Sequence, residues 1–262
     1  MPRVSVILAV FNGERFLTPA IESILSQTFG DLELIVVDDG STDGTAGILR
    51  GIRDSRVRCL TNQRNEGIYA SLNKGLQLAS GEYVCPMDAD DIALPMRIQR
   101  EVAFLDQNPE CAMVGSHVRL IDELGIEIGV ETPPTADKKI RSIMFIHNPF
   151  IHATMMIRSS VLQTVGGYDD RFLYNGDYDL WLRIASRYRF ANLSEILLLR
   201  RIHAKAVTIE HELELVRNRI KTLHHAILHY YHKPVFLVYL VRPVLAYTFR
   251  RIQKLLVPLL KR

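Results

Sequence analysis

The segment YVCPMDADDIALPMR, residues 83 to 97, ends an apolar run abruptly in three carboxylates, Asp88, Asp90 and Asp91. Carboxylates crowded at the end of a buried strand repel one another, so folding alone gives little reason for this cluster. A hard divalent cation would give one, because Mg²⁺ and Mn²⁺ use one or two carboxylates together with substrate phosphates. The spacing therefore suggests a metal-diphosphate site. The alternative is a solvated acidic turn that caps the next helix.

A second pair of carboxylates, Asp177 and Asp179, opens the amphipathic stretch DYDLWLR. A carboxylate in a partly apolar cleft suits a general base, because burial raises its pKa towards the working pH. The structural alternative is negative charge at a helix N-terminus, which the helix dipole favours.

The elements that would position these groups alternate along the first hundred residues. Short β-rich apolar runs, which predict strands, occupy 4–11, 32–38, 56–61 and 82–87. Segments with helical spacing lie between them, flanked by Gly, Ser or Asp. Such alternation predicts βαβ units, a parallel sheet, and ligands bound at the carboxyl ends of its strands, where Asp38, Asp39 and Asp88 fall.

The pattern becomes irregular from residue 110 onward. A hairpin is expected around Asp122 to Gly125, where turn-forming residues gather. A strand is expected over 151–158, a helix over 177–188 and a further strand over 190–202.

Length and composition limit what the site could belong to. A chain of 262 residues, 48% of them hydrophobic, can bury a sizeable core as one domain with or without an appendage. Three widely spaced cysteines, Cys59, Cys85 and Cys111, fit neither a disulfide framework nor a zinc cluster, so we expect buried thiols in a reducing compartment. The segment MPRVSVILAVF has no secretory-signal pattern, which favours a cytosolic location.

The last part of the chain is basic. Ten cations and no anion follow Glu214, whereas 22 cations and 29 anions precede them. The apolar segment 234–249 is interrupted by Arg242 and Pro243, so it falls short of the roughly 20 apolar residues that span a bilayer. It fits a segment lying in the interface of an anionic membrane, or else a helix packed on the body or on a second copy. Nucleic acid is a poorer partner, because long aliphatic stretches make few phosphate contacts.

Taken together and in order, these motifs resemble the family 2 glycosyltransferases with the A-type fold. The motifs are VSVILAVFNGERFLTPAIESILSQTFGDLELIVVDDGSTDGT, RNEG, GEYVCPMDADDIALPMRIQRE, HATMMIR, VGGYDDRF, GDYDLWLR and RRIH. The resemblance covers about residues 3 to 205. It implies an α/β, Rossmann-like fold with a mostly parallel central sheet flanked by helices and a C-terminal helical extension. We expect a donor-binding half over 1–110, an acceptor-binding and catalytic half over 111–208, and a basic apolar tail over 209–262.

The resemblance also implies where a nucleotide-sugar donor would bind. The residues matching Ala9 and Phe11 wall the base pocket, and the one matching Asp39 hydrogen-bonds a uracil ring. Arg64 matches a residue that approaches the donor phosphates. The alternatives are a turn-forming role for Asp39 in DDGST and a solvated loop charge for Arg64. Because Ala9 lacks the larger or hydroxylated side chain sometimes found there, the base stays open: a UDP-sugar is favoured, with dTDP- or GDP-sugars as alternatives.

The same resemblance assigns roles to the carboxylate cluster. Asp88, with Ala89 beside it, contacts the ribose or the sugar, and Asp90 binds Mn²⁺ or Mg²⁺. Asp91 orients the loop or caps a helix beginning near Leu94. His203 matches a position where a histidine adds a metal ligand or a phosphate contact, although a single histidine in a loop commonly does neither.

On the acceptor side, the match of DYDLWLR to the family pattern makes Asp177 the general base. The family usually has Glu just before this residue, whereas this chain has Gly176. His152 and Trp181 are candidates for lining the acceptor cleft, although a lone Trp on an amphipathic helix is more often part of the core.

The function that these residues imply is a metal-dependent, inverting glycosyltransferase. It would use a glycan or lipid-linked acceptor at the cytoplasmic face of the membrane, in the synthesis of a cell-surface polysaccharide. An aspartyl-nucleophile phosphatase is an alternative, with Asp88 as nucleophile, Asp90 as acid and Asp169 with Asp170 as a distal metal pair, but Ile92 stands where Thr or Val is usual.

A non-catalytic nucleotide-sugar-binding module is another alternative, which Gly176 favours. A dinucleotide oxidoreductase is disfavoured, because FNGERF lacks the glycine fingerprint after the first strand.

Overall fold

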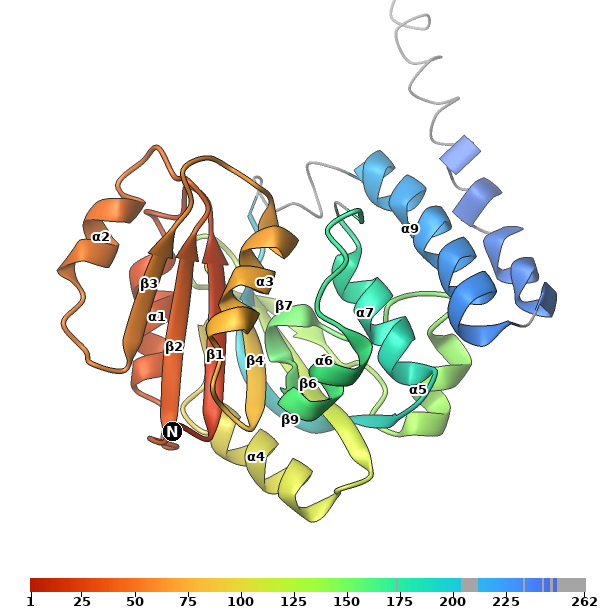
Figure 1. Ribbon diagram of the computed structural model, residues 1–262, viewed down its shortest axis with the longest axis horizontal. Helices are drawn as coiled ribbons and strands as arrows, with labels where there is room; N and C mark the ends of the chain where they lie inside the picture. The colour runs from red at the N-terminus through yellow and green to blue at the C-terminus, as the bar shows by residue number, and fades with distance from the viewer. Residues whose placement is uncertain (173, 204–211, 233, 242, 246, 249–262) are drawn as a thin grey trace, which may run out of the picture.

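The computed structural model describes residues 1–172, 174–203, 212–232, 234–241, 243–245 and 247–248. Its centre is one mixed sheet with the strand order β3 (Val57–Thr61), β2 (Leu32–Asp38), β1 (Val4–Val10), β4 (Tyr83–Asp88), β8 (Met156–Arg158), β6 (Cys111–Ile121), β9 (Arg189–Arg201) and β5 (Ile92–Ala93), and β7 (Glu127–Glu131) pairs with β6 outside this path. Helices cover the sheet on both faces, and the C-terminal helices stand beside α7 at one end (Figure 1). The predicted α/β fold with a mostly parallel sheet is confirmed.

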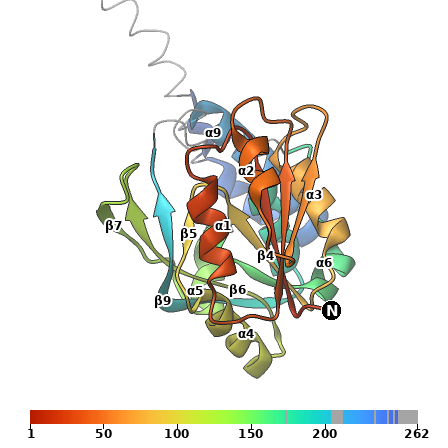
Figure 2. The same cartoon turned by 90° about the vertical axis from the view of Figure 1, so that its left-hand side faces the viewer.

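The first half of the chain folds as the alternating pattern predicts. The strands β1 (Val4–Val10), β2 (Leu32–Asp38), β3 (Val57–Thr61) and β4 (Tyr83–Asp88) are parallel. The helices between them are α1 (Leu17–Leu25), α2 (Thr45–Gly51) and α3 (Ile68–Leu78). Every residue of β1 and β2 is buried, since α1 and α3 cover opposite faces of the sheet (Figure 2).

The register brings the ends of these strands together. Val10 of β1 pairs with Asp38 of β2, and Ala9 pairs with Asp88 of β4. The carboxyl ends of three strands therefore meet at one edge of the sheet, which is where open parallel sheets bind ligands.

The second half continues the same sheet in mixed directions. The helix α4 (Arg97–Gln107) leads into β6 (Cys111–Ile121), which turns at Asp122 into β7 (Glu127–Glu131). Asp122 Oδ1 accepts hydrogen bonds from the backbone N–H groups of Leu124 and Ile126, and Gly125 has a φ of 84°, so the expected hairpin is confirmed. Further elements are β5 (Ile92–Ala93), α5 (Asp137–Ile143), β8 (Met156–Arg158), α6 (Ser159–Val165), α7 (Gly176–Ala185) and β9 (Arg189–Arg201).

Two expectations were wrong in detail. The strand expected over 151–158 is only β8, preceded by a 3₁₀ turn at His152–Thr154, because both the N–H and the hydroxyl of Thr154 hydrogen-bond to the Ile151 carbonyl. Cys59 is exposed rather than buried, because β3 lies at the edge of the sheet, whereas Cys85 and Cys111 are buried.

The C-terminal elements begin as part of the body. The helix α9 (Glu212–Ala226) continues into a π-helical turn (Ile227–Tyr231) and a 3₁₀ helix, η3 (Pro234–Leu240). Leu223, Ala226 and Ile227 are fully buried in the same cluster as Trp181 of α7. The start of the expected tail is thus packed on the body, as the sequence also allowed for the segment that follows.

Within the described part of the chain, no helix has the length and apolar character needed to cross a membrane. Several cations of the tail lie outside the described residues: Lys233, Arg242, Arg250, Arg251, Lys254, Lys261 and Arg262.

Candidate active site

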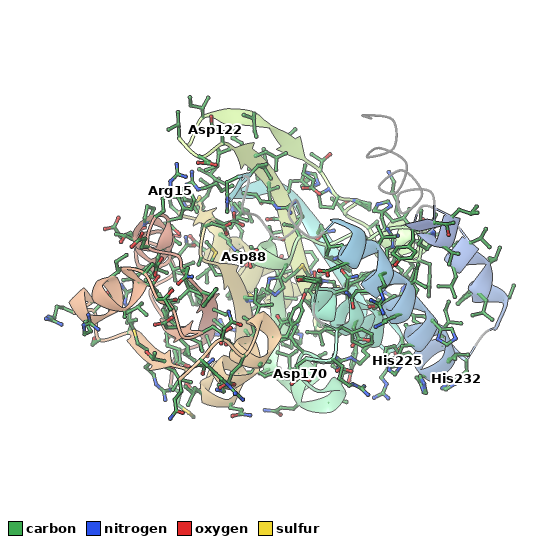
Figure 3. All side chains as sticks on the ribbon, turned by 90° about the horizontal axis from the view of Figure 1, so that it is seen from above. Arg15, Asp88, Asp122, Asp170, His225 and His232 are labelled. Atoms are coloured by element: carbon green, nitrogen blue, oxygen red, sulfur yellow. The ribbon has the colours of Figure 1, made fainter. Side chains whose placement is uncertain are left out.

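The floor of the candidate site is the edge where β1, β2 and β4 end. Seen from above, Asp88 lies near the centre of the molecule, with Arg15 and Asp122 on one side and Asp170 on the other (Figure 3). Ala9 is buried at this edge, and Phe11, two residues on, exposes 47% of its surface. An exposed aromatic ring beside a buried small residue could stack on a base, as expected for a donor pocket.

Asp39 holds the loop that borders this edge. Its Oδ1 accepts hydrogen bonds from Asn62 Nδ2 (2.8 Å) and the Glu66 N–H (2.9 Å), and its Oδ2 accepts one from the Gly67 N–H (2.9 Å). These bonds tie the loop at 62–67 to the end of β2, so Asp39 has a structural role, although its partners lie outside the DDGST turn considered for it. Its contact with a base stays a prediction.

Gly40 is required where this loop approaches the DDGST turn. Its φ is 73°, and a Cβ there would lie 2.6 Å from the carbonyl carbon of Arg64. Arg64 is consequently held beside the turn by its backbone, and its side chain is exposed at the rim. The neighbouring Asp38 accepts a bond from the Ser41 N–H, and its Oδ2 is buried without a partner in the described structure.

Asp88 and Asp90 each face a histidine from a distant part of the chain. His152 Nδ1 lies 3.1 Å from Asp88 Oδ1, and His203 Nε2 lies 2.8 Å from Asp90 Oδ2. Burial, the largest single effect, would raise the pKa of Asp88, but the hydrogen bond with His152 and the charges of His152 and two nearby arginines together outweigh it, and the pKa is lowered. Burial and then the charge of Asp88 raise the pKa of Asp90. The two carboxylates therefore differ electrostatically, and each side chain is still about a third exposed.

Arg201 fixes the loop between these carboxylates. Its N–H donates to Asp91 Oδ1 (2.8 Å), its Nε donates to the Asp90 carbonyl (2.9 Å), and its guanidinium lies over the Phe16 ring. Asp91 is thus an orienting residue. It does not cap α4, which begins only at Arg97 after Met96.

The residues fit a divalent cation that takes most of its ligands from phosphate and water. In the described ranges, no group of three or more acidic, His or Cys side chains is arranged to hold a metal ion. Asp90 nevertheless offers a carboxylate that is about a third exposed, next to two further carboxylates whose repulsion a cation would relieve. One or two carboxylates are what such ions typically take from a protein when they bind a nucleotide.

Asp177 lies in the first turn of α7 and is held by two side chains. Tyr69 Oη donates to its Oδ1 (3.1 Å), and Asn148 Nδ2 donates to its Oδ2 (3.2 Å). Burial raises the pKa of Asp177, while the charge of His152 and the hydrogen bond from Tyr69 act in the opposite direction. A half-buried carboxylate with a raised pKa has the character of a general base.

Gly176 leaves room for the Tyr69 ring. A Cβ at residue 176 would lie 2.8 to 2.9 Å from three carbons of that ring, closer than real side chains approach. The space that the family's usual Glu would need is therefore occupied by Tyr69, whose hydroxyl contacts Asp177.

A chain of polar and aromatic contacts links Asp88 to Asp177. His152 Nε2 lies 3.0 Å from Tyr168 Oη, and the rings of Tyr168 and Tyr69 stack with centroids 5.5 Å apart. The two carboxylates to which the sequence assigned sugar contact and proton transfer therefore belong to one connected site.

The other candidates on α7 have structural surroundings. Asp179 is fully buried, and its oxygens accept bonds from Arg183 Nε (2.8 Å) and Tyr230 Oη (2.9 Å). Trp181 is also fully buried, packed between Phe150 and His152. It therefore supports His152 from below and does not form an exposed wall of an acceptor cleft, whereas His152 faces the site.

The distal pair required by a phosphatase is not arranged as that alternative needs. Asp169 forms an ion pair with Arg171 (2.6 Å) and lies in a shallow pocket with Gly166, Gly167 and Tyr230. The charge of Asp169 is therefore neutralised by Arg171, and Asp169 does not act as a metal ligand alongside Asp88 and Asp90.

Sequence reasoning missed four residues of the site: Tyr69, Asn148, Tyr168 and Arg201. Tyr168 and Arg201 lie within quoted motifs, VGGYDDRF and RRIH, but no pattern of spacing assigns them a partner. Tyr69 and Asp177 are 108 residues apart in the sequence, so only the fold brings them together.

Comparison with known proteins points the same way as the geometry. The family model described as "Glycosyl transferase family 2" matches residues 5–166, which include the carboxylate cluster and the turn that carries His152.

Curated relatives cover most of the chain. EpsE of Bacillus subtilis (strain 168), which carries a glycosyltransferase name, is 39% identical over 75% of this chain and 72% of its own. The O-antigen biosynthesis glycosyltransferase WbnJ of Escherichia coli is 35% identical over 78% of this chain and 81% of its own. WfaP of Escherichia coli, named a UDP-Glc:alpha-D-GlcNAc-diphosphoundecaprenol beta-1,3-glucosyltransferase, is 29% identical over 87% of this chain and 91% of its own.

Solved structures share the fold at lower identity. TarS of S. aureus in complex with UDP-GlcNAc has a TM-score of 0.72 at 20% identity, over 94% of this chain and 73% of that one. The mannosyltransferase PcManGT of Pyrobaculum calidifontis, in complex with GDP-Man and Mn²⁺, has a TM-score of 0.68 at 18% identity, over 94% and 75% respectively.

Proposed function

Because the chain belongs to glycosyl transferase family 2 and is a glycosyltransferase, we propose that it transfers a sugar with inversion from a nucleoside-diphosphate sugar to a hydroxyl group. One observation carries this proposal: the contacts through His152, Tyr168 and Tyr69 join Asp88 of the donor edge to Asp177. A site for displacement at the anomeric carbon needs the donor and the base within one cavity.

The donor lies at the edge formed by β1, β2 and β4. Phe11 stacks on the base, Asp39 and Ala9 border it, and Arg64 approaches the phosphates from the rim. A UDP-sugar is favoured, and the neighbours with bound UDP-GlcNAc and GDP-Man support binding of a nucleotide sugar in this fold.

The reaction forms one bond and breaks another. Asp177 takes the proton of the acceptor hydroxyl, whose oxygen attacks the anomeric carbon, and the bond to the departing diphosphate breaks with its electron pair on that group. Asp90, with His203 beside it, would hold Mn²⁺ or Mg²⁺, which would supply neutralising charge for the diphosphate. Asp88, held by His152, contacts the ribose or the sugar.

The acceptor is a glycan or a lipid-linked sugar of a cell-surface polysaccharide. The names of WbnJ and WfaP, which refer to O-antigen biosynthesis and to a diphosphoundecaprenol acceptor, support this choice. The enzyme would act at the cytoplasmic face of the membrane and associate with anionic lipid through its basic C-terminal segment.

Thermal unfolding with a panel of nucleotide sugars and Mn²⁺ tests the donor, because a ligand selective for the folded state raises the melting temperature. The stabilising donor should then release its nucleoside diphosphate when acceptor is added. Phosphate release from simple phosphomonoesters would instead support a phosphatase, and donor binding without turnover would support a binding module.

A further inference from the structure

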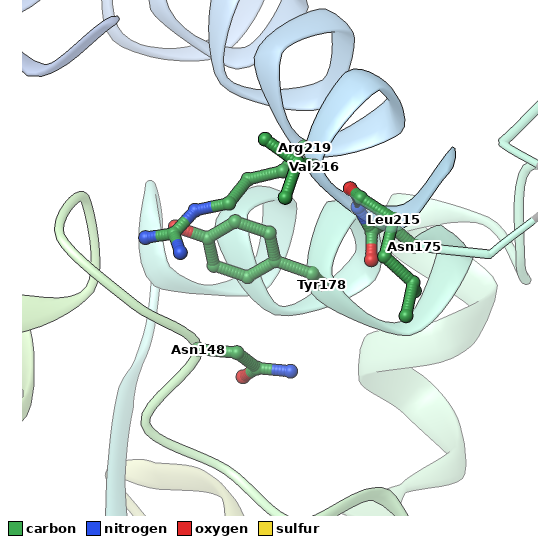
Figure 4. A pocket seen from close by; sticks show the side chains of 6 residues that line it. All are labelled: Asn148, Asn175, Tyr178, Leu215, Val216 and Arg219. Atoms are coloured by element: carbon green, nitrogen blue, oxygen red, sulfur yellow. Dashed lines mark hydrogen bonds between the residues drawn. The ribbon is translucent and has the colours of Figure 1, made fainter. Parts of the chain in front are cut away.

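A small pocket lies between α9, the start of α7 and the segment around residue 148. Its volume is about 200 Å³, and it is lined by Asn148, Asn175, Tyr178, Leu215, Val216 and Arg219 (Figure 4). None of these residues has a role in the donor site, so the pocket needs an account of its own.

The unusual group in this pocket is the guanidinium of Arg219. Its Nε is buried and has no hydrogen-bond partner within the described residues. No ion pair in the described part of the chain includes Arg219, and the rest of its guanidinium interacts with the hydroxyl of Tyr178. A buried donor on a charged group is costly to leave unpaired, and a planar guanidinium is suited to bind an oxyanion through two parallel hydrogen bonds.

The pocket adjoins the candidate base. Asn148 lines the pocket and also donates a hydrogen bond to Asp177 Oδ2 (3.2 Å). Asn175, on the other wall, immediately precedes α7 and donates to the Leu215 carbonyl (3.1 Å), which ties α9 to the start of α7. A group bound at Arg219 is therefore one side chain away from the carboxylate that would deprotonate the acceptor.

The C-terminal helices also carry exposed apolar side chains. The 3₁₀ helix η3 packs against α9, and Val235, Leu237 and Val238 on it are exposed. An acceptor that carries a phosphate and a lipid chain would find a cation in the pocket and apolar side chains on the helix that packs against α9.

We infer that the pocket at Arg219 binds a phosphate group of the acceptor, and that the acceptor hydroxyl reaches Asp177 while this phosphate pairs with the guanidinium. The inference rests on the proposed function and narrows its acceptor to a lipid diphosphate-linked sugar. Arg219 is a binding residue for the acceptor and takes no part in donor binding.

Calorimetric titration of farnesyl diphosphate into the full chain tests this inference. The enzyme is first saturated with UDP and Mn²⁺, so that the probe cannot occupy the donor phosphate site.

Arg219→Gln should weaken farnesyl diphosphate binding at least tenfold, whereas Arg217→Gln should change it less than twofold, because Arg217 is exposed on the same helix. UDP affinity and melting temperature should match the wild type in both variants. Arg219→Lys keeps the charge without the planar fork and should also bind more weakly.

The other probes identify the source of the phosphate. Inorganic pyrophosphate should bind more weakly than farnesyl diphosphate, and equal affinity would overturn the lipid-linked acceptor. Glucuronate carries a carboxylate in place of a phosphate. If it displaces farnesyl diphosphate as well as pyrophosphate does, the assignment of the pocket to phosphate is overturned. Wild-type affinity in Arg219→Gln, or an equal loss in Arg217→Gln, would overturn the site itself. The slow hydrolysis of the nucleotide sugar that occurs without acceptor tests the proposed function separately. Arg219→Gln should retain this hydrolysis, because the inference gives Arg219 no contact with the donor.

Discussion

Tyr69→Phe removes one hydroxyl from the site while keeping the ring that packs over Gly176 and stacks on Tyr168. The lost bond is 3.1 Å long and ends on a carboxylate, and hydrogen bonds to charged groups contribute about 1.5–3 kcal/mol. Because 3.1 Å is long for an O–H···O bond, we take the lower part of this range. We expect kcat to fall by about 10- to 30-fold, since 1.4 kcal/mol corresponds to tenfold, while KM for the donor stays unchanged.

The same substitution has a defined effect on the pH profile. The bond from Tyr69 lowers the pKa of Asp177, against the larger effect of burial, so its removal raises that pKa further. The acid limb of kcat should move to higher pH, because a larger share of Asp177 is protonated at a given pH. Tyr83→Phe is the matched control, since it removes a partly buried Tyr–Asp bond to Asp106 away from the site. A Tyr69→Phe enzyme with wild-type kcat and an unmoved acid limb would refute the positioning role of the hydroxyl.

Three further predictions concern the metal, the packing and the C-terminal segment. EDTA or Asp90→Ala should weaken UDP binding at least tenfold, about 1.4 kcal/mol by calorimetry, and undiminished affinity in a folded variant would remove Asp90 from the metal site. Gly176→Ala should cost about 1–3 kcal/mol in urea unfolding through overpacking against Tyr69, and clearly less in a Tyr69→Ala background; equal costs would contradict the clash. Val238→Glu should reduce sedimentation of the full chain with anionic liposomes, whereas Leu124→Glu, on the exposed hairpin, should not. Equal effects of the two substitutions would contradict membrane binding through the C-terminal helices.

The fold of the first half of the chain could be predicted from the sequence because its determinants are local. Apolar strands and amphipathic helices alternate at regular spacing, and two of the parallel strands end in carboxylates of the candidate site, Asp38 and Asp88. The crowding of Asp88, Asp90 and Asp91 also identified the carboxylate loop without any knowledge of the partners that hold it.

The rest depends on contacts that sequence spacing does not encode. His152 faces Asp88 only because a 3₁₀ turn replaces the start of the expected strand. Tyr69 reaches Asp177 from the other half of the chain, and Trp181 is covered by Phe150 and His152. The burial of Leu223 and Ala226 likewise makes α9 part of the core, although the sequence placed it at the start of a basic tail.

The most direct test of the account is the rate of sugar transfer by Asp177→Asn, measured together with its affinity for the nucleotide. The amide fills the same space but cannot accept the acceptor proton, and a general base contributes about 10²- to 10⁴-fold. The account predicts a loss of transfer in this range with unchanged UDP affinity. Transfer within a fewfold of the wild type by a folded Asp177→Asn enzyme would contradict the assignment of the base.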